Sequence, residues 1–389
     1  MTTPTIAADT VATGLKAQVL HENLTAALRR VTGAVSAKST LPIIHNVLIE
    51  SHAGRLRLTC TDLELTASAY CGARVEAEGA TTVNAALFTR AVAALPKQPI
   101  DFDASGRRNL QMTCGRAEQR MATMDAADFP RTPAIEDETA CEMDGGALET
   151  AIKRVLFGVA IDLLRPSLTG VHWSAKDGGL TLAAADGFRL LVASVPGLAG
   201  VTLPDIVVPG RAIRELVSML PRAPIVVRVN RAHSRVAFDM GDTTLVSQLI
   251  QEAFPKYGQL MPAESETAVA ITVDAAALRD AIGVVEPYAR EGSGIIRFRV
   301  LDSRTLHVSA TANETGAGEM LVDVETSGDI SGARVALNQR YIREALSEIE
   351  GRAVLRLITA SQQVVLVPAE DDGADYRQVI MPMFIQWES

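Results

Sequence analysis

The feature of this 389-residue sequence that most constrains its fold is an internal repeat with a period of about 125 residues. An L-x-x-A-[L/I] pattern occurs three times, and its spacings of three and four place apolar side chains on one face of a helix. The copies are Leu24/Ala27/Leu28, Leu148/Ala151/Ile152 and Leu278/Ala281/Ile282, at offsets of 124 and 130 residues. The pattern therefore indicates one structural unit that is used three times.

Two further features recur with the same period. A second helix-like segment begins with Asn or Pro, which are favoured at helix starts, at 84–96, 209–221 and 338–350. Between the helices lies an alternating run, typical of half-buried β-strands, at 55–70, 179–195 and 305–322. Each run contains an Asx residue, a natural turn former: Asp62, Asp186 and Asn313.

These repeats predict an α+β fold of three domains, each with two helices and about eight strands in mainly antiparallel sheets. The expected domains are residues 15–140, 141–265 and 266–389, after a disordered tail at residues 1–14. The tail lacks the charged and apolar regions of a secretory signal. No apolar run reaches the ~18 residues of a transmembrane helix, so we expect a cytoplasmic protein that does not bind membranes.

Composition limits the possible functions. The four cysteines, Cys60, Cys71, Cys114 and Cys141, form no C-x-x-C pair, and no histidine lies at zinc-finger spacing from them. We predict reduced, mostly buried thiols, no metal site and no cofactor. The net charge of −9, from 37 basic and 46 acidic residues, initially argues against nucleic-acid binding, because such domains usually carry a basic excess.

Short motifs in all three repeats resemble one known family. Leu41-Pro42-Ile43 with Thr61-Asp62-Leu63-Glu64, and Ala126 to Pro130 (AADFP), are similar to the first domain of the bacterial DNA polymerase III beta subunit, the sliding clamp. Ala185 to Leu190 (ADGFRL) is close to the A-T-D-G-H-R-L of the second domain, and Tyr376 to Met383 (YRQVIMPM) to the Y-V-V-M-P-M of the third. The resemblance covers nearly the whole chain after residue 15, in order.

The resemblance implies a head-to-tail homodimer of three-domain protomers, a closed ring whose helices line a hole around double-stranded DNA. It implies a non-catalytic processivity factor for DNA polymerase III that binds DNA without reading its sequence. The implied protein partners are the replicative DNA polymerase alpha subunit, the clamp loader and other proteins with a clamp-binding motif.

A ring of this kind requires basic helices and an acidic remainder. The helices are expected at 22–35, 84–97, 147–158, 209–222, 275–290 and 338–350. They contain thirteen basic and eight acidic residues, a charge of +5 that leaves −14 for the rest of the chain. Because charges interact over a screening length of about 10 Å, the local charge of the hole matters more for phosphate binding than the net charge does.

The predicted DNA-facing residues are basic side chains of these helices, together with two loop residues at positions that touch DNA in the family, Lys38 and Arg165. The helical ones are Arg29, Arg30, Arg90, Lys97, Lys153, Arg154, Arg211, Arg214, Arg279, Arg340 and Arg343. Pro166 and Ser167 follow Arg165 where family members often have aromatic residues, which predicts a weaker contact there.

Family members dock short peptides in a groove between the second and third domains. Carried over by position, the groove wall consists of Leu168, Ala185, Gly187, Phe188, Arg189, Leu190, Pro255, Gln259, Leu260, Val379, Met381, Pro382 and Met383. Leu, Met and Pro form an apolar pocket in which Met adapts to varied ligands. Arg189 is expected to donate a hydrogen bond to a peptide carbonyl or carboxylate.

The sequence departs from the family pattern around this groove. Ala185 and Phe188 replace Thr and His, Gln259 stands where an Arg is common, and the chain continues past Met383 as FIQWES. These departures predict an altered ligand preference, with a tail that covers the groove, extends it or contacts a partner.

The dimer interface also follows from the resemblance. By position, Gln119 and Met121 of one copy pair with Pro287 and Tyr288 of the other. The polar Gln119 predicts a weaker contact than the apolar family residues give.

Two other classes of function remain open. An enzyme has little support, because the sequence contains no G-x-x-x-x-G-K-[ST], H-E-x-x-H or G-x-S-x-G motif. The other class is a divergent clamp paralogue that acts as a repair or protein-interaction scaffold. Ring closure in solution separates this scaffold from a working clamp.

Overall fold

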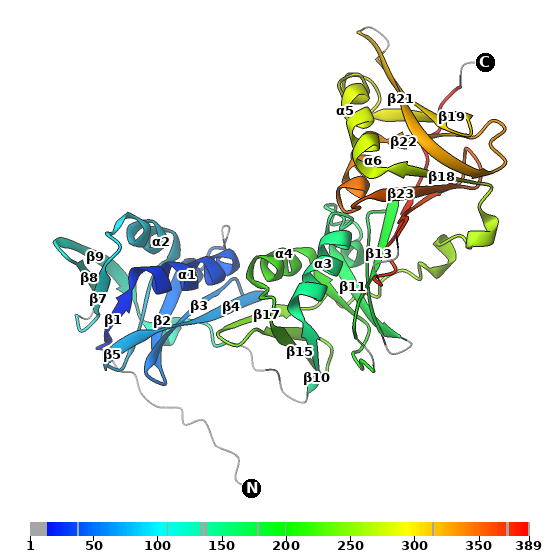
Figure 1. Ribbon diagram of the computed structural model, residues 1–389. Helices are drawn as coiled ribbons and strands as arrows, with labels where there is room; N and C mark the ends of the chain where they lie inside the picture. Colours follow the sequence, from blue (N-terminus) through cyan, green and yellow to red (C-terminus); the bar gives the residue numbers. More distant parts are fainter. Residues whose placement is uncertain are drawn as a thin grey trace. The chain divides into compact units, whose positions relative to one another are not determined.

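The computed structural model of the chain describes residues 14–36, 39–106, 108–132, 135, 138–176, 179–198, 200–312, 315–370 and 373–387. The chain forms two compact units, Met1–Gly145 with Arg214–Leu249, and Gly146–Ile213 with Ile250–Ser389. Figure 1 traces the elements of both. The second repeat contributes to both units because some of its strands pair with the first repeat and others with the third.

The first unit is built on a 13-stranded sheet in which all neighbouring strands are antiparallel. In pairing order the strands are β10 (Glu138–Asp144), β15 (Pro224–Asn230), β16 (Arg235–Asp239), β17 (Thr243–Gln248), β4 (Leu65–Cys71), β3 (Arg55–Thr61), β2 (Asn46–His52), β6 (Ala80–Asn84), β9 (Ala117–Met124), β8 (Asn109–Cys114), β7 (Pro99–Asp103), β1 (Lys16–Leu20) and β5 (Ala73–Ala77). Helix α1 (His21–Val31) packs on β3 and β4 and lies next to α2 (Ala85–Ala94).

The second unit has a 12-stranded antiparallel sheet. Its order is β14 (Ile206–Pro209), β11 (Gly170–Lys176), β12 (Gly179–Ala185), β13 (Arg189–Val195), β25 (Arg377–Ile380), β24 (Val364–Pro368), β23 (Arg352–Leu357), β18 (Val269–Asp274), β21 (Gly316–Gly328), β20 (Thr305–Ala312), β19 (Ile295–Asp302) and β22 (Arg334–Asn338). Helices α5 (Ala275–Glu291) and α6 (Gln339–Ser347) lie side by side, and α5 packs on β19 to β21 (Figure 1). Helices α3 (Gly145–Leu156) and α4 (Gly210–Met219) each include residues of both units.

The repeated sequence patterns form the structure that they predict. All nine residues of the L-x-x-A-[L/I] copies are buried, with at most 3% exposure. Asp62 and Asp186 form the expected turns, since each Oδ1 accepts hydrogen bonds from the backbone N–H groups two and three residues later, at 2.7–3.1 Å. Asn84 and Asn338 cap α2 and α6 in the same way. Asn313 lies outside the described residues.

Four helices are shorter than predicted. α1 ends at Val31 and is followed by a 3₁₀ turn at Thr32–Ala34. α2 ends at Ala94 and α4 at Met219, each two residues before a proline. A proline disfavours the helical conformation of the residue before it, and Leu95 is accordingly extended. α6 ends at Ser347. Lys97 therefore lies beyond its helix, and the observed helices hold eleven basic and seven acidic residues, a charge of +4 instead of +5.

The cysteines have the predicted character. Cys60, Cys71 and Cys114 are buried, Cys141 is partly exposed, and all four are free thiols. Burial raises the pKa of the Cys71 thiol to about 12. Within the described ranges, no group of three His, Cys, Asp or Glu side chains is placed to hold a metal ion. The helices in those ranges are also too short or too polar to span a membrane.

Candidate functional site

The strands of the second and third repeats join at one antiparallel junction. β13 pairs with β25, so that Arg189 lies opposite Ile380 and Leu190 opposite Val379. The Met381 N–H extends this ladder by donating to the Phe188 carbonyl oxygen at 2.9 Å. The junction therefore brings together the two predicted wall segments, 185–190 and 379–383, which are far apart in the sequence.

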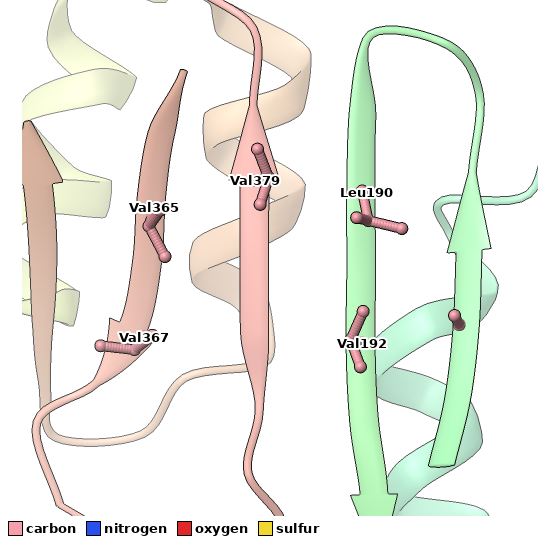
Figure 2. Packing of buried hydrophobic residues seen from close by; sticks show 6 residues of the cluster. Leu190, Val192, Val365, Val367 and Val379 are labelled. Atoms are coloured by element: carbon pink, nitrogen blue, oxygen red, sulfur yellow. The ribbon is translucent and has the colours of Figure 1, made fainter. Parts of the chain in front are cut away.

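An apolar layer covers one face of the junction. Figure 2 shows its members on β13, β24 and β25, all at most 8% exposed: Leu190, Val192, Val365, Val367 and Val379. The segment before β18 packs against this layer through Phe254, Tyr257 and Met261. This packing holds the predicted wall residues of that segment close to the junction.

The turn before β13 presents an aromatic side chain to solvent. Gly187 has a left-handed backbone (φ 93°), a conformation that glycine adopts without strain. Phe188 follows it and is 61% exposed, while Leu260 and Met381 are 55% and 47% exposed. These three are the large apolar side chains that the predicted wall exposes to solvent.

The other wall residues range from exposed to buried. Pro255 and Gln259 are exposed, and Ala185 and Met383 are half-buried. Four residues are buried and support the wall from beneath: Leu168, Leu190, Val379 and Pro382. Direct contact with a ligand is therefore restricted to the exposed and half-buried members.

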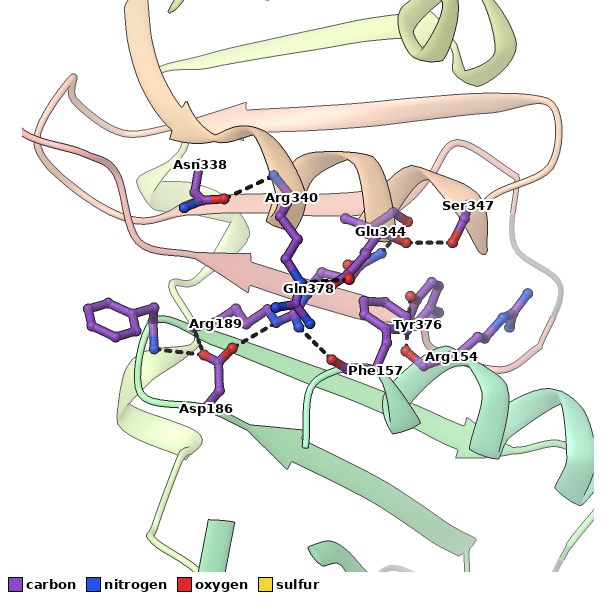
Figure 3. Close-up of polar contacts among 12 residues, drawn as sticks. Arg154, Phe157, Asp186, Arg189, Asn338, Arg340, Glu344, Ser347, Tyr376 and Gln378 are labelled. Atoms are coloured by element: carbon purple, nitrogen blue, oxygen red, sulfur yellow. Dashed lines mark hydrogen bonds and ion pairs between the residues drawn. The ribbon is translucent and has the colours of Figure 1, made fainter. Parts of the chain in front are cut away.

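Arg189 has a structural role within the protein (Figure 3). Its side chain is 4% exposed, and Nε and Nη1 donate to Asp186 at 3.0 Å and to Glu344 at 2.5 Å. Nη2 donates to the Phe157 carbonyl oxygen, and the guanidinium carbon lies 4.5 Å from the centroid of the Tyr341 ring. Every guanidinium nitrogen is engaged inside the protein. Arg189 is therefore a positioning residue in this structure, and its hydrogen bond to a ligand stays a prediction.

The network around Arg189 also fixes the charge of Glu344. Burial alone would raise the pKa of the Glu344 carboxyl, but hydrogen bonds from Arg340 and Arg189 hold that pKa below its ordinary value. Glu344 is not among the predicted site residues, although its i, i+4 spacing from Arg340 is a signal for a pair on one helix. The ionised carboxylate ties α6 of the third repeat to the turn before β13 of the second.

Most of the predicted DNA-facing side chains are exposed, and Lys38 lies outside the described residues. The exposed ones are Arg29, Arg30, Arg90, Lys97, Lys153, Arg165, Arg211, Arg214, Arg340 and Arg343. Some of them pair with carboxylates at 2.6–3.0 Å: Lys153 with Glu149, Arg340 with Glu344 and Arg343 with Glu286. Exposed pairs contribute only about 0–1 kcal/mol, so phosphate groups can replace these carboxylates at little cost.

Two of the predicted DNA-facing arginines make structural contacts. The Arg279 Nη1 donates to the carbonyl oxygens of Leu346 and Ile349, at 2.7 and 3.3 Å, and so anchors the end of α6. The Arg154 guanidinium lies over the Tyr376 ring, 4.9 Å from its centroid. Both arginines are half-buried, so part of each side chain is used inside the protein, and their contact with DNA stays a prediction.

The predicted dimer residues lie on β9 and at the end of α5. Met121 is buried, Gln119 and Tyr288 are half-buried, and Pro287 is exposed. Tyr288 lies against β21, where a Cβ atom at Gly318 would come within 2.6 Å of its ring. Glycine at position 318 therefore leaves the space that the tyrosine ring occupies.

The C-terminal tail follows the outer edge of β22. The Met383 N–H donates to the Ala336 carbonyl oxygen at 2.8 Å, and Phe384 is exposed. The Trp387 ring then stacks on Arg334, with the guanidinium carbon 4.9 Å from the ring centroid. Glu388 and Ser389 lie outside the described residues.

Comparison with known proteins gives the family. Models of the N-terminal, central and C-terminal domains of the DNA polymerase III beta subunit match residues 15–133, 142–256 and 258–384. The beta sliding clamp of Synechococcus elongatus is 29% identical over 374 residues, which cover 93% of this chain and 97% of the relative. Crystal structures of the beta subunit of Thermotoga maritima and the beta sliding clamp of C. crescentus share the fold, each with a TM-score of 0.88, at 23% and 24% identity. Each covers 96% of this chain, and the matches span 100% and 99% of those chains. The chain belongs to the DNA polymerase III beta subunit family, the beta sliding clamps.

Proposed function

We propose that this protein is a DNA sliding clamp, in which two copies close head to tail around double-stranded DNA and hold partner proteins there without catalysing a reaction. Its membership of the beta sliding clamps supports this function and gives no support to the scaffold alternative. The structural observation that carries the proposal is a strand junction that occurs twice within the chain and leaves one matching pair of edges open.

The two internal junctions have the same form. In the first unit β4 pairs with β17, with Leu65 opposite Ser247. In the second unit β13 pairs with β25, with Arg189 opposite Ile380. Both junctions are antiparallel, and both join the strand after an Asx turn to the last strand of the next repeat.

Two strands remain without such a junction. They are β21, which follows the Asx residue of the third repeat, and β9, the last strand of the first repeat. Among the described residues, 316–323 of β21 pair only with β20, and 117–122 of β9 pair only with β8. Open strand edges template pairing with another chain. A second copy of the chain would cover both edges, and two such contacts would close a ring.

The repeat also gives the register of this contact. The third residue after the turn Asx is equivalent in the three repeats: Leu65, Arg189 and Gly316. At the other side, three residues pair with the strand that precedes the second helix of their repeat: Met124, Ile250 and Met383. The residues three positions earlier are therefore equivalent: Met121, Ser247 and Ile380.

This register places Met121 of one copy opposite Gly316 of the other. Gln119 then lies opposite Gly318, the glycine against which Tyr288 packs. Three of the four predicted dimer residues thereby meet at one interface.

The exposed basic side chains of the helices suit the lining of such a ring. Arginine and lysine contacts to phosphates position a protein on DNA without reading its sequence, as a sliding ring requires. The exposed apolar wall formed by Phe188, Leu260 and Met381 is the proposed docking site for the replicative polymerase alpha subunit, the clamp loader and other partners with a clamp-binding motif. This function requires the cytoplasm, where bacterial DNA lies.

The test of the proposal is retention on DNA of different topology. After loading by the clamp loader, the protein should stay bound to nicked circular DNA during gel filtration and should be lost when the circle is linearised. A ring held by topology slides off a free end, whereas a surface-bound protein does not. Equal retention on both forms would contradict encirclement.

The proposed register makes a separate prediction about dimer strength. It places Glu118 of one copy opposite Glu319 of the other, and like charges directly opposite each other destabilise a sheet. Glu118→Lys should tighten the dimer by up to about fivefold per interface. Dilution followed by analytical ultracentrifugation measures this change. Adding Glu319→Lys restores a like-charge pair and should return the dissociation constant towards that of the unchanged protein, while weaker dimerisation of Glu118→Lys alone would contradict the register.

A further inference from the structure

One face of the third repeat is unusually rich in arginine. In β19 the buried side chains Ile296, Phe298 and Val300 alternate with Arg297 and Arg299, so the two arginines point to the opposite face. Arg299 lies opposite Arg334 of β22 on one side and opposite His307 of β20 on the other. We call Arg297, Arg299, His307, Arg334 and Trp387 the arginine face.

No carboxylate in the part of the chain that the structure describes neutralises the arginines of this face. Among the described residues, none of the three forms an ion pair, and Arg297 donates only to the Thr311 hydroxyl, at 2.7 Å. Like charges directly opposite each other disfavour strand pairing, yet Arg299 and Arg334 lie opposite each other, and no described carboxylate is paired with either of them. These guanidinium groups are therefore available to bind an anion.

The tail residue Trp387 adds an aromatic surface to the same face. Its ring lies on the Arg334 guanidinium, and the hydrogen bond from Met383 to Ala336 holds the tail along β22. Trp387, Arg297, Arg299 and His307 line a cavity of about 450 Å³. This volume lies within the range of ~300–1,000 Å³ for small-molecule sites.

The polar groups around the cavity complete the site. Ser309 and Thr311 place hydroxyl groups in the wall, and Glu319 is the one carboxylate among the described residues that line it. In the single chain Glu319 is largely exposed at the rim, on the strand edge proposed to pair with a second copy, and it lies 3.0 Å from the His307 Nε2. Arginine side chains therefore dominate the charge of the cavity, although the chain as a whole carries −9.

We propose that the arginine face binds single-stranded DNA, with phosphates on Arg297 and Arg299 and a base against the Trp387 indole. Cationic side chains beside an aromatic ring are the combination with which proteins hold single strands without reading their sequence. An acidic peptide would use the arginines but would leave the indole without a role. The site is separate from the helix-lined hole that would enclose the duplex and from the predicted groove wall. Disproof of single-strand binding would therefore leave the proposed clamp function intact.

Tryptophan fluorescence can observe this site directly. The chain has two tryptophans, and Trp173 is fully buried, so quenching by a ligand reports on Trp387. Titration of the full-length protein with oligodeoxythymidine should give saturable quenching. In anisotropy with a labelled oligonucleotide, Trp387→Ala should weaken binding by at least about fivefold, the effect of losing one stacked base.

Charge variants separate a built site from general attraction. Arg299→Ala should weaken binding and reduce its salt dependence, because one phosphate contact is lost. Arg74→Ala, an exposed arginine of β5 in the other unit, is the matched control and should bind as the unchanged protein does. A chain that ends at Met383 should lose single-strand binding and keep its retention on circular duplex DNA. A chain that ends at Trp387, without the acidic Glu388, should bind at least as tightly as the full chain.

Four results would overturn the proposal. They are absence of quenching, equal losses for Arg299→Ala and Arg74→Ala, loss of binding when the chain ends at Trp387, and tighter binding of polyglutamate than of the oligonucleotide. The last result would assign the face to an acidic protein partner.

Discussion

Replacing Arg189 by Ala should lower the free energy of unfolding by about 3 kcal/mol. This is the lower end of the range for breaking a buried ion pair, because Glu344 keeps 26% of its side chain exposed. The substitution removes the arginine partner of Asp186 and the more buried of the two arginine partners of Glu344. It also removes the side chain that donates to the Phe157 carbonyl oxygen. Urea unfolding followed by circular dichroism measures the loss.

Arg340→Ala is the matched control, because Arg340 donates to the same Glu344 carboxylate but is 58% exposed. It should cost less than about 1 kcal/mol, and an equal loss for both variants would refute the role given to Arg189.

The pH dependence of stability tests the same network. The pKa of Glu344 is lowered in the folded state, so its contribution is fully present above its unfolded pKa of ~4.3 and is lost as the pH falls through the lower folded pKa. The difference in stability between the unchanged protein and Arg189→Ala should therefore shrink below about pH 4.

The double variant Met381→Ala with Met383→Ala should weaken binding of a polymerase-derived peptide by about 30-fold or more. This corresponds to the ~2 kcal/mol lost when a central interface side chain is truncated. Met381 is exposed and Met383 is half-buried, so their loss removes ligand contact and little core packing. The Met383 N–H still bonds to Ala336 because that bond uses the backbone. Fluorescence anisotropy with a labelled peptide measures the affinity.

Leu301→Ala is the matched control for the peptide experiment. Leu301 is similar to Met381 in exposure but lies on β19, away from the predicted wall. It should leave peptide affinity unchanged. Full-strength peptide binding by the double methionine variant would show that the peptide docks elsewhere.

The sequence predicts the threefold architecture because the signals for it are local. The L-x-x-A-[L/I] spacing marks a helical face whatever surrounds it, and Asp62 and Asp186 form turns through atoms two and three residues away. The predicted helix ends are less accurate. The apolar pattern continues up to Pro96 and Pro221, but each proline ends its helix two residues earlier. Lys97 was placed on a helix for this reason.

The roles of single arginines depend on distant partners and so escape sequence reasoning. Arg189 meets Glu344 across 155 positions, and Arg279 meets Leu346 across 67. A charge count treats these anchored guanidinium groups as equal to the exposed Arg29 or Arg214. The helices carry a net positive charge, as predicted, but some of the arginines that contribute to it, such as Arg279, anchor neighbouring elements.

The strand junction that recurs inside the chain also explains why the repeats are fused. A single repeat released on its own would carry both halves of the junction, one at each end, like a monomer with two complementary reactive groups. Such monomers add to one another until the growing assembly happens to close. Linking three repeats covalently pairs most of these ends within one polypeptide, so that assembly needs only one kind of encounter between two chains. In the proposed ring, opening a single junction would be enough to admit DNA.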